Sequence, residues 1–151
     1  MSTSQIYFNT ILGPISIIEK NKKIIYLNFK KTKSKKINYR LIDLKKKILL
    51  YLSGKIKKIS GNFKIEGNKK QIQTWNIMRK IPYGDTWSYK TISKIVKTSP
   101  RHIGKICSQN KILLFIPCHR VINSNGELGG FSGTGGINLK KKLLELEKLN
   151  S

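Results

Sequence analysis

The sequence predicts two small domains, an α/β domain over residues 1–66 and a mainly helical domain over residues 67–151. Three observations carry this prediction. Apolar segments separated by turn residues fill residues 5–29, as expected of paired strands. The apolar spacing then becomes helical from Leu41 to Leu52. In the second half, two short helical patterns flank a Ser-Pro turn within residues 89–109, which indicates a helix-turn-helix.

Charge is the most unusual feature of the composition. The 151 residues include 31 Lys and Arg against 7 Asp and Glu, a formal net charge of +24. Such a field attracts polyanions, so nucleic acid is the first partner to consider and an anionic membrane surface the second. The alternative is a general compositional bias, because most of the charge is lysine in a chain also rich in Ile and Asn.

The sequence argues against several classes of protein. Two cysteines do not make a disulfide scaffold and indicate a reducing compartment, and with two histidines they cannot supply a four-ligand zinc site. The N-terminus lacks a signal-peptide pattern, and no apolar run reaches membrane-spanning length. The glycine-rich loop 129–136 lacks the Gly-Lys-Ser/Thr of a phosphate-binding loop. We therefore expect a cytoplasmic protein without metal, cofactor or membrane contact.

The first half reads as a scaffold. After the strands, residues 30–36 form a basic loop, the helix 41–52 ends at Ser53-Gly54, and residues 59–65 could add a strand. Nothing in this half carries recognisable chemistry.

The second half carries a candidate DNA-reading surface. Ser88 is a plausible N-cap for a helix from Tyr89 to Val96, with Ile92, Ile95 and Val96 pointing inward. A second helix is predicted over residues 101–109, where Ile103, Ile106 and Cys107 share one side, and Cys107 reads as a packed core thiol. Its opposite side presents Arg101, Lys105 and Ser108, with Gly104 at the edge. A basic, small face suits a helix-turn-helix reader of DNA, although an ordinary helical hairpin fits the same pattern.

Cys118 and His119 are the candidate reactive pair. They follow a run of five apolar residues, 112–116, that is predicted to form a short buried strand ended by a proline. A thiol beside an imidazole is the minimum for an activated sulfur nucleophile. A buried cysteine beside a surface histidine is the alternative, but the strand end, the following Arg120 and the loop 129–136 favour the nucleophile.

Glu147 is the candidate third member. It lies on the apolar side of a predicted helix over residues 138–149, and a buried carboxylate needs a partner. His119 is the natural candidate, which gives a Cys118–His119–Glu147 arrangement. A salt bridge from Glu147 to a lysine at the chain end remains an alternative. Asn110, between the second helix and the strand, could cap the helix or tie the loop to the active-site turn.

The segment Pro117-Cys118-His119-Arg120-Val121 resembles the active-site signature of the O6-alkylguanine-DNA alkyltransferases. The likeness extends over residues 71–148 in the family's order, through Ile-Pro-Tyr-Gly-Asp-Thr, Arg101, Gly104 and the glycine loop. It implies a ribonuclease H-like N-terminal domain and a winged-helix-like C-terminal domain. It also implies repair of O6-alkylguanine, and of O4-alkylthymine as a further possibility, by stoichiometric transfer to the protein's own cysteine. The partner would be double-stranded DNA, bound by a monomer without protein partners.

The resemblance also implies residue roles. Cys118 would accept the alkyl group, His119 would activate it through a water, Glu147 would complete the set and Asn110 would brace the turn. Tyr89 would contact the flipped guanine or its phosphate, and Arg101 would fill the gap left in the duplex. The residues expected to contact DNA or the base are Tyr89, Arg101, Gly104, Lys105, Ser108, Arg120, Phe131 and Ser132.

Four features depart from the family's pattern. Phe131 replaces a tyrosine, Lys111 replaces a proline, the segment between Tyr89 and Arg101 is two residues shorter, and the glycine loop is about two residues longer. Three alternatives stay open: a lesion-recognition protein of the same fold without transfer, a Cys-His hydrolase, and a simple helix-turn-helix regulator.

Overall fold

The computed structural model describes residues 3–130 and 135–151. The first part of the chain forms a three-stranded antiparallel sheet in the order β1-β2-β3. β1 spans Thr3–Thr10, β2 spans Gly13–Lys20 and β3 spans Lys23–Asn28. Between β2 and β3, Asn21 and Lys22 have φ angles of 53° and 62°, the left-handed pair of a type I′ turn, whose twist suits a hairpin. The predicted β structure is confirmed.

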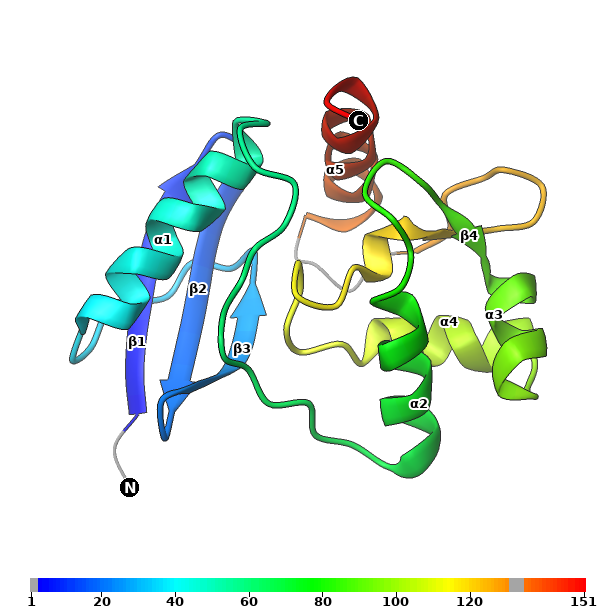
Figure 1. Ribbon diagram of the computed structural model, residues 1–151, viewed down its shortest axis with the longest axis horizontal. Coiled ribbons are helices and arrows are strands. Elements are labelled where there is room, and N and C mark those ends of the chain that lie inside the picture. Colours follow the sequence, from blue (N-terminus) through cyan, green and yellow to red (C-terminus); the bar gives the residue numbers. More distant parts are fainter. Residues whose placement is uncertain (1–2, 131–134) are drawn as a thin grey trace.

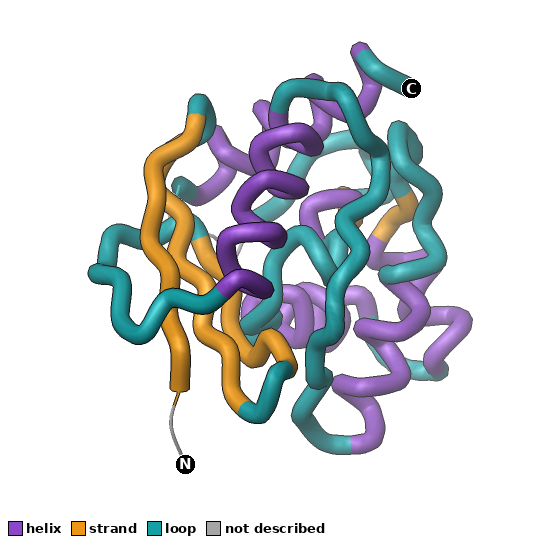
Figure 2. The backbone as a smooth tube through the Cα atoms, turned by 60° about the vertical axis from the view of Figure 1, so that its left-hand side comes forward, coloured by secondary structure: helices purple, strands orange, loops and turns teal. Residues whose placement is uncertain are grey.

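Helix α1, Tyr39–Leu52, lies across the sheet (Figure 2). It begins two residues before the predicted start, because Asn38 accepts the backbone N–H of Leu41 at 3.1 Å and caps the helix. The buried carboxylate of Glu19 on β2 pairs with Arg40 at 2.9 Å and fixes the first turn to the sheet. The apolar spacing is confirmed by the buried residues of the helix, which are Leu41, Leu44, Ile48, Tyr51 and Leu52.

The second part is mainly helical, as predicted. Its elements are α2 (Lys69–Met78), β4 (Trp87–Ser88), α3 (Tyr89–Val96), α4 (Pro100–Ser108), the one-turn 3-10 helix η1 (Cys118–Arg120), β5 (Val121–Ile122) and α5 (Gly136–Leu149). Ser88 caps α3, and Ser99 caps α4 with Pro100 at its first position, where the missing N–H costs nothing. Figure 1 shows the sheet and α1 on one side, the helices α2, α3 and α4 on the other, and α5 above them. None of the described helices is both long and apolar enough to cross a membrane.

Three local predictions are wrong. Residues 112–116 are buried except for the half-buried Leu114, but they form no strand. Leu113 pairs with Ile116 across a tight turn in which Leu114 has a φ of 72°, so the apolar run reports burial rather than extension. Residues 59–65 contribute one bridge, from Phe63 to Ile24, instead of a strand. Ile95 is 46% exposed and does not point inward.

The segment that leads to Cys118 is hydrogen-bonded to the N-terminal sheet. The backbone N–H of Leu27 on β3 donates to the carbonyl of Lys111 at 2.9 Å, and Leu113 donates back to Leu27 at 3.0 Å. The sheet therefore positions the chain a few residues before the candidate nucleophile.

Candidate active site

The backbone around Cys118 is held by short-range hydrogen bonds. Within η1, Cys118 N–H donates to Ile116 at 2.8 Å and Arg120 N–H donates to the carbonyl of Pro117 at 2.9 Å. The buried Asn110 braces this turn from outside: its amide nitrogen lies 2.9 Å from the Ile116 carbonyl and 3.2 Å from the sulfur of Cys118. Its amide oxygen accepts the Ile112 N–H at 2.9 Å. Asn110 therefore ties the connecting loop to the turn.

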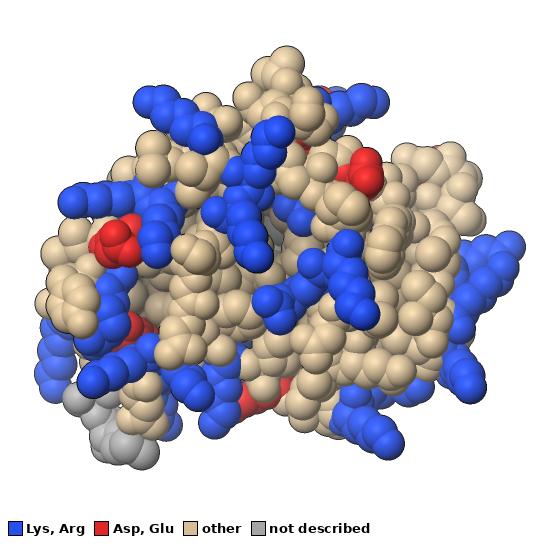
Figure 3. Space-filling view, viewed as in Figure 1, with Lys and Arg blue, Asp and Glu red and all other residues tan. Residues whose placement is uncertain are grey.

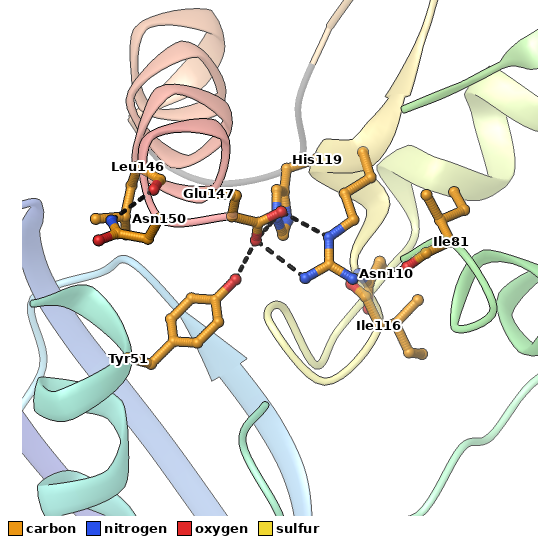
Figure 4. A network of polar contacts seen from close by, with 9 residues as sticks. Tyr51, Ile81, Asn110, Ile116, His119, Leu146, Glu147 and Asn150 are labelled. Carbon is orange, nitrogen blue, oxygen red and sulfur yellow. Dashed lines mark hydrogen bonds and ion pairs between the residues drawn. The ribbon is translucent and has the colours of Figure 1, made fainter. Parts of the chain in front are cut away.

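The structure brings His119 and Glu147 together. His119 Nε2 lies 2.7 Å from Glu147 Oε2, and both side chains are 1% exposed. Arg120 donates to the same carboxylate, from Nε to Oε1 at 2.7 Å and from Nη2 to Oε2 at 3.1 Å. The hydroxyl of Tyr51 on α1 also donates to Glu147 Oε2 (Figure 4). A buried carboxylate with this many donors has its charge compensated.

The protonation states follow from this geometry. Burial raises the pKa of Glu147, but the hydrogen bonds from His119 and Arg120 and the positive charge of Arg120 outweigh that effect and lower it to about 2. Burial lowers the pKa of His119 despite the opposing pull of Glu147. Because an ionised carboxylate can only accept, Nε2 of a neutral His119 carries the proton, and Nδ1 is left with a lone pair. His119 can therefore act as a base through Nδ1.

Cys118 faces helix α4 across a pocket. It is 2% exposed and lines a pocket of about 480 Å³ together with Tyr89, Arg101, Gly104, Cys107 and Ser108. Burial raises the pKa of Cys107, which therefore stays a neutral thiol in the pocket wall. The pocket joins the candidate nucleophile directly to the predicted DNA-reading face.

That face of α4 matches the predicted one. Arg101, Lys105 and Ser108 are exposed and Gly104 is half-buried, while the opposite side of the helix is buried. A Cβ on Gly104 would meet no atom within 4 Å, so the protein's own packing does not require a glycine there. A bare backbone at this position leaves room for a ligand to approach. Lysines and arginines are also scattered across the face in Figure 3, over both halves, so the charge is not confined to α4.

Lys140 is a residue of the site that sequence analysis missed. Although fully buried, its Nζ donates to the carbonyl groups of Val121 at 2.6 Å, Leu128 and Gly130 at 3.1 Å. It also lies 3.2 Å from the hydroxyl of Tyr89. Burial lowers its pKa to about 8, so it still carries its proton at pH 7. Lys140 therefore holds the loop after η1 close to Tyr89.

A signal for this burial was present in the sequence. Lys140 precedes Leu143 by three residues, Leu144 by four and Glu147 by seven, which places it on the inner face of α5. Gly129 completes the arrangement, because its φ is 71° and a Cβ there would lie 3.0 Å from the Tyr89 hydroxyl.

The geometry of Arg120 does not favour the DNA contact predicted for it. Arg120 is 9% exposed, and its guanidinium is committed to Glu147 and to the carbonyl of Ile81, 2.9 Å from Nη1. Its charge is paired with the buried carboxylate of Glu147. Phe131 and Ser132 lie outside the described residues.

Comparison with known proteins decides the family. A sequence profile described as 6-O-methylguanine DNA methyltransferase, DNA binding domain, matches residues 69–149. The chain belongs to this family. A family member from Metallosphaera sedula, named methylated-DNA–protein-cysteine methyltransferase, is 39% identical over 138 residues, 89% of this chain and 86% of that protein. A protein of the same name from Sulfolobus acidocaldarius is 39% identical over 145 residues, 95% of this chain and 92% of its own length.

Solved structures of the family agree with the fold over nearly the whole chain. The O6-methylguanine methyltransferase of Mycobacterium tuberculosis superimposes with a TM-score of 0.85 at 25% identity, covering 99% of this chain and 95% of that one. The same organism's protein in complex with DNA gives a TM-score of 0.81 at 26% identity, covering 97% and 94%. The overall architecture of a small sheet with helices is therefore that of the family.

Proposed function

We propose that this protein repairs DNA by transferring the alkyl group of O6-alkylguanine to Cys118 and thereby inactivates itself. The observation that carries the proposal is the pocket that Cys118 lines together with the exposed face of α4, while His119, the next residue in the chain, is paired with Glu147. Family membership supports the same reaction.

The transfer step follows from the residues. His119 Nδ1 takes the thiol proton through a water, and the ionised Glu147 stabilises the imidazolium that forms. The thiolate attacks the alkyl carbon, a sulfur–carbon bond forms, and the carbon–O6 bond breaks with its electron pair going to the base. A proton then restores neutral guanine. The thioether product has no good leaving group, so each protein acts once.

Access to the base requires it to leave the duplex, because the alkyl carbon is otherwise stacked inside. We propose that α4 enters the minor groove, with Arg101 occupying the vacated space and Gly104, Lys105 and Ser108 along the groove and its backbone. Tyr89 would contact the flipped guanine or its phosphate, held in place by Lys140. Phe131 and Ser132 remain proposed contacts on the basis of the family's pattern.

Further proposals concern the protein as a whole. The family's pattern supports a division into two domains near residue 66, with a ribonuclease H-like first domain and a winged-helix-like second one. It also supports a monomer that acts alone on double-stranded DNA. A cytoplasmic location is supported by the low cysteine content, two cysteines in 151 residues, which is unlike a disulfide scaffold.

The test is a titration of the protein with a duplex that carries one O6-methylguanine. We expect loss of the methyl group from DNA in a single burst that saturates at one per protein. Binding without loss would favour a lesion-recognition protein. Steady turnover of a chromogenic ester, with no methyl loss, would favour a Cys-His hydrolase.

A further inference from the structure

The hydroxyl of Tyr51 links the N-terminal half to the carboxylate behind the nucleophile. Tyr51 lies in the last turn of α1, is 2% exposed, and donates to Oε2 of Glu147, the oxygen that also contacts His119. Figure 4 shows its ring pointing from α1 toward Glu147 on α5. The residues that it joins lie 96 positions apart in the sequence.

We propose that Tyr51 is a positioning residue for alkyl transfer, which holds Glu147 in the orientation that keeps His119 basic at Nδ1. The inference rests on the proposed function and extends the transfer machinery to the half of the chain that otherwise reads as scaffold.

Among the described donors to Glu147, Tyr51 is distinguished by its origin. His119 and Arg120 both come from η1, so they tie the carboxylate to the same turn that carries Cys118. Those bonds would survive a shift of η1 and α5 together. Tyr51 is the side-chain donor that fixes this unit relative to α1 and the sheet.

Helix α1 is itself held at both ends, which makes it a rigid support. At its start, Arg40 pairs with the buried Glu19 of β2. At its end, Gly54 has a φ of 79° and lies so close to the side chain of Asn150 that a Cβ would come within 2.5 Å of it. The end of α1 therefore packs against the end of α5, next to Glu147.

Burial first, and then Glu147, raises the pKa of Tyr51 far above its ordinary value. The phenol therefore keeps its proton, and remains a donor, throughout the neutral and alkaline range in which a thiol is titrated.

Tyr83 provides a matched control. Its ring packs edge-on against that of Tyr51 with 5.9 Å between the centroids. Its hydroxyl is buried but has no hydrogen-bond partner among the described residues. Tyr51→Phe and Tyr83→Phe thus remove the same atom from two touching rings, and only the first removes a hydrogen bond to Glu147.

The experiment compares wild type, Y51F and Y83F in two assays on the full chain. The first is the single-turnover rate of methyl transfer from an O6-methylguanine duplex. The second is the pH dependence of Cys118 labelling by iodoacetamide without DNA, read on the peptide that contains Cys118. Thermal melting and duplex affinity confirm that each variant is folded and binds.

We expect Y51F to slow transfer about tenfold, the effect of losing one hydrogen bond to a charged group, at unchanged affinity and final stoichiometry. Its labelling midpoint should move to higher pH, because a Glu147 that is no longer held in place stabilises the imidazolium of His119, and with it the Cys118 thiolate, less well. Y83F should match wild type within about twofold in both assays, since its hydroxyl makes no bond.

Equal behaviour of Y51F and Y83F in rate and in midpoint would overturn the proposal. If Y51F does not fold, 3-fluorotyrosine at position 51 takes its place, because it keeps the hydroxyl and makes it a stronger donor to Glu147. The labelling midpoint should then move to lower pH. An unchanged midpoint would also overturn the proposal. Labelling needs neither DNA nor transfer, so absence of transfer in wild type would sink the proposed function while the midpoint still tests Tyr51.

Discussion

The two sides of the turn at residues 118–120 differ in their exposure to solvent and in the charges that surround them. On one side, Cys118 faces an open pocket beneath the exposed, basic face of α4. On the other side, the next two residues, His119 and Arg120, are sealed against Glu147 with almost no contact with solvent. This arrangement suits the proposed roles, because a sulfur that accepts an alkyl group must be reachable by a base in DNA, whereas groups that set its protonation act best where water is excluded.

The two sides of the turn also differ in their charges. The open side presents cations to a polyanion, at long range and in salt-dependent fashion. The closed side holds one carboxylate whose charge is balanced by Arg120 and by hydrogen bonds. Changes on the closed side should therefore alter chemistry and stability, and changes on the open side should alter chemistry or DNA contact with the fold intact.

The largest effect is expected from removing the sulfur. Cys118→Ala should abolish methyl transfer while leaving affinity for an O6-methylguanine duplex within about twofold, because an alanine removes no group that contacts DNA. Transfer and affinity are measured on the same preparation. Equal loss of both would contradict the assignment of Cys118, and Cys107→Ser should retain transfer.

The next largest is expected from Glu147→Gln on the closed side. The amide can donate to Nε2 of His119, which would shift the ring proton to Nδ1 and remove the base, so transfer should slow at least about a hundredfold. Leaving Arg120 without its counter-charge should also cost about 3–5 kcal/mol of stability. Glu145→Gln, an exposed carboxylate two residues earlier on α5, is the control and should change neither quantity. Identical behaviour of the two variants would remove Glu147 from the account.

Acid should remove the stability that the ionised carboxylate of Glu147 contributes. The folded pKa of Glu147, about 2, lies below its ordinary value of 4.5, so its contribution to stability is complete above pH 4.5 and is lost as pH falls toward 2. Urea unfolding at pH 5 and pH 2 should show the difference between wild type and Glu147→Gln shrinking by about 3 kcal/mol. The lowered pKa of His119 acts in the same direction below pH 6.5. A difference that stays constant with pH would mean that the carboxylate is not stabilised in the ionised form.

The smallest effect is expected on the open side. Arg101→Ala should slow transfer about tenfold without changing thermal stability, because an exposed side chain that would fill the duplex is lost while nothing in the core moves. Lys142→Ala, which removes an exposed cation from α5, should weaken binding only through the general charge. If the two variants slow transfer equally, the role of Arg101 is no more than electrostatic.

Local signals made much of the fold and part of the site predictable. Ser88 and Ser99-Pro100 marked the starts of α3 and α4, and the spacing of Leu143 and Glu147 placed a carboxylate on the inner face of α5. These features depend on residues within a few positions of one another.

Most of the features that were missed depend on tertiary contacts. The bond from Tyr51 to Glu147 spans the whole fold, and nothing near Tyr51 in the sequence announces it. The apolar run 112–116 predicted a strand because burial and extension leave the same pattern in a short segment. Arg120 looked like a phosphate ligand, and Lys140 like one more surface lysine, because a charge is expected outside until its buried partners are known.

The central claim, that Cys118 is the alkyl acceptor, is tested most directly by weighing tryptic peptides after incubation with an O6-methylguanine duplex. Trypsin releases Cys118 in the peptide Ile112–Arg120 and Cys107 in the peptide Ile106–Lys111, so each cysteine is read separately. We predict that the first peptide gains one methylene, saturating at one per protein, and that the second is unchanged. An unmodified Ile112–Arg120 peptide from protein that has bound the duplex would contradict the account.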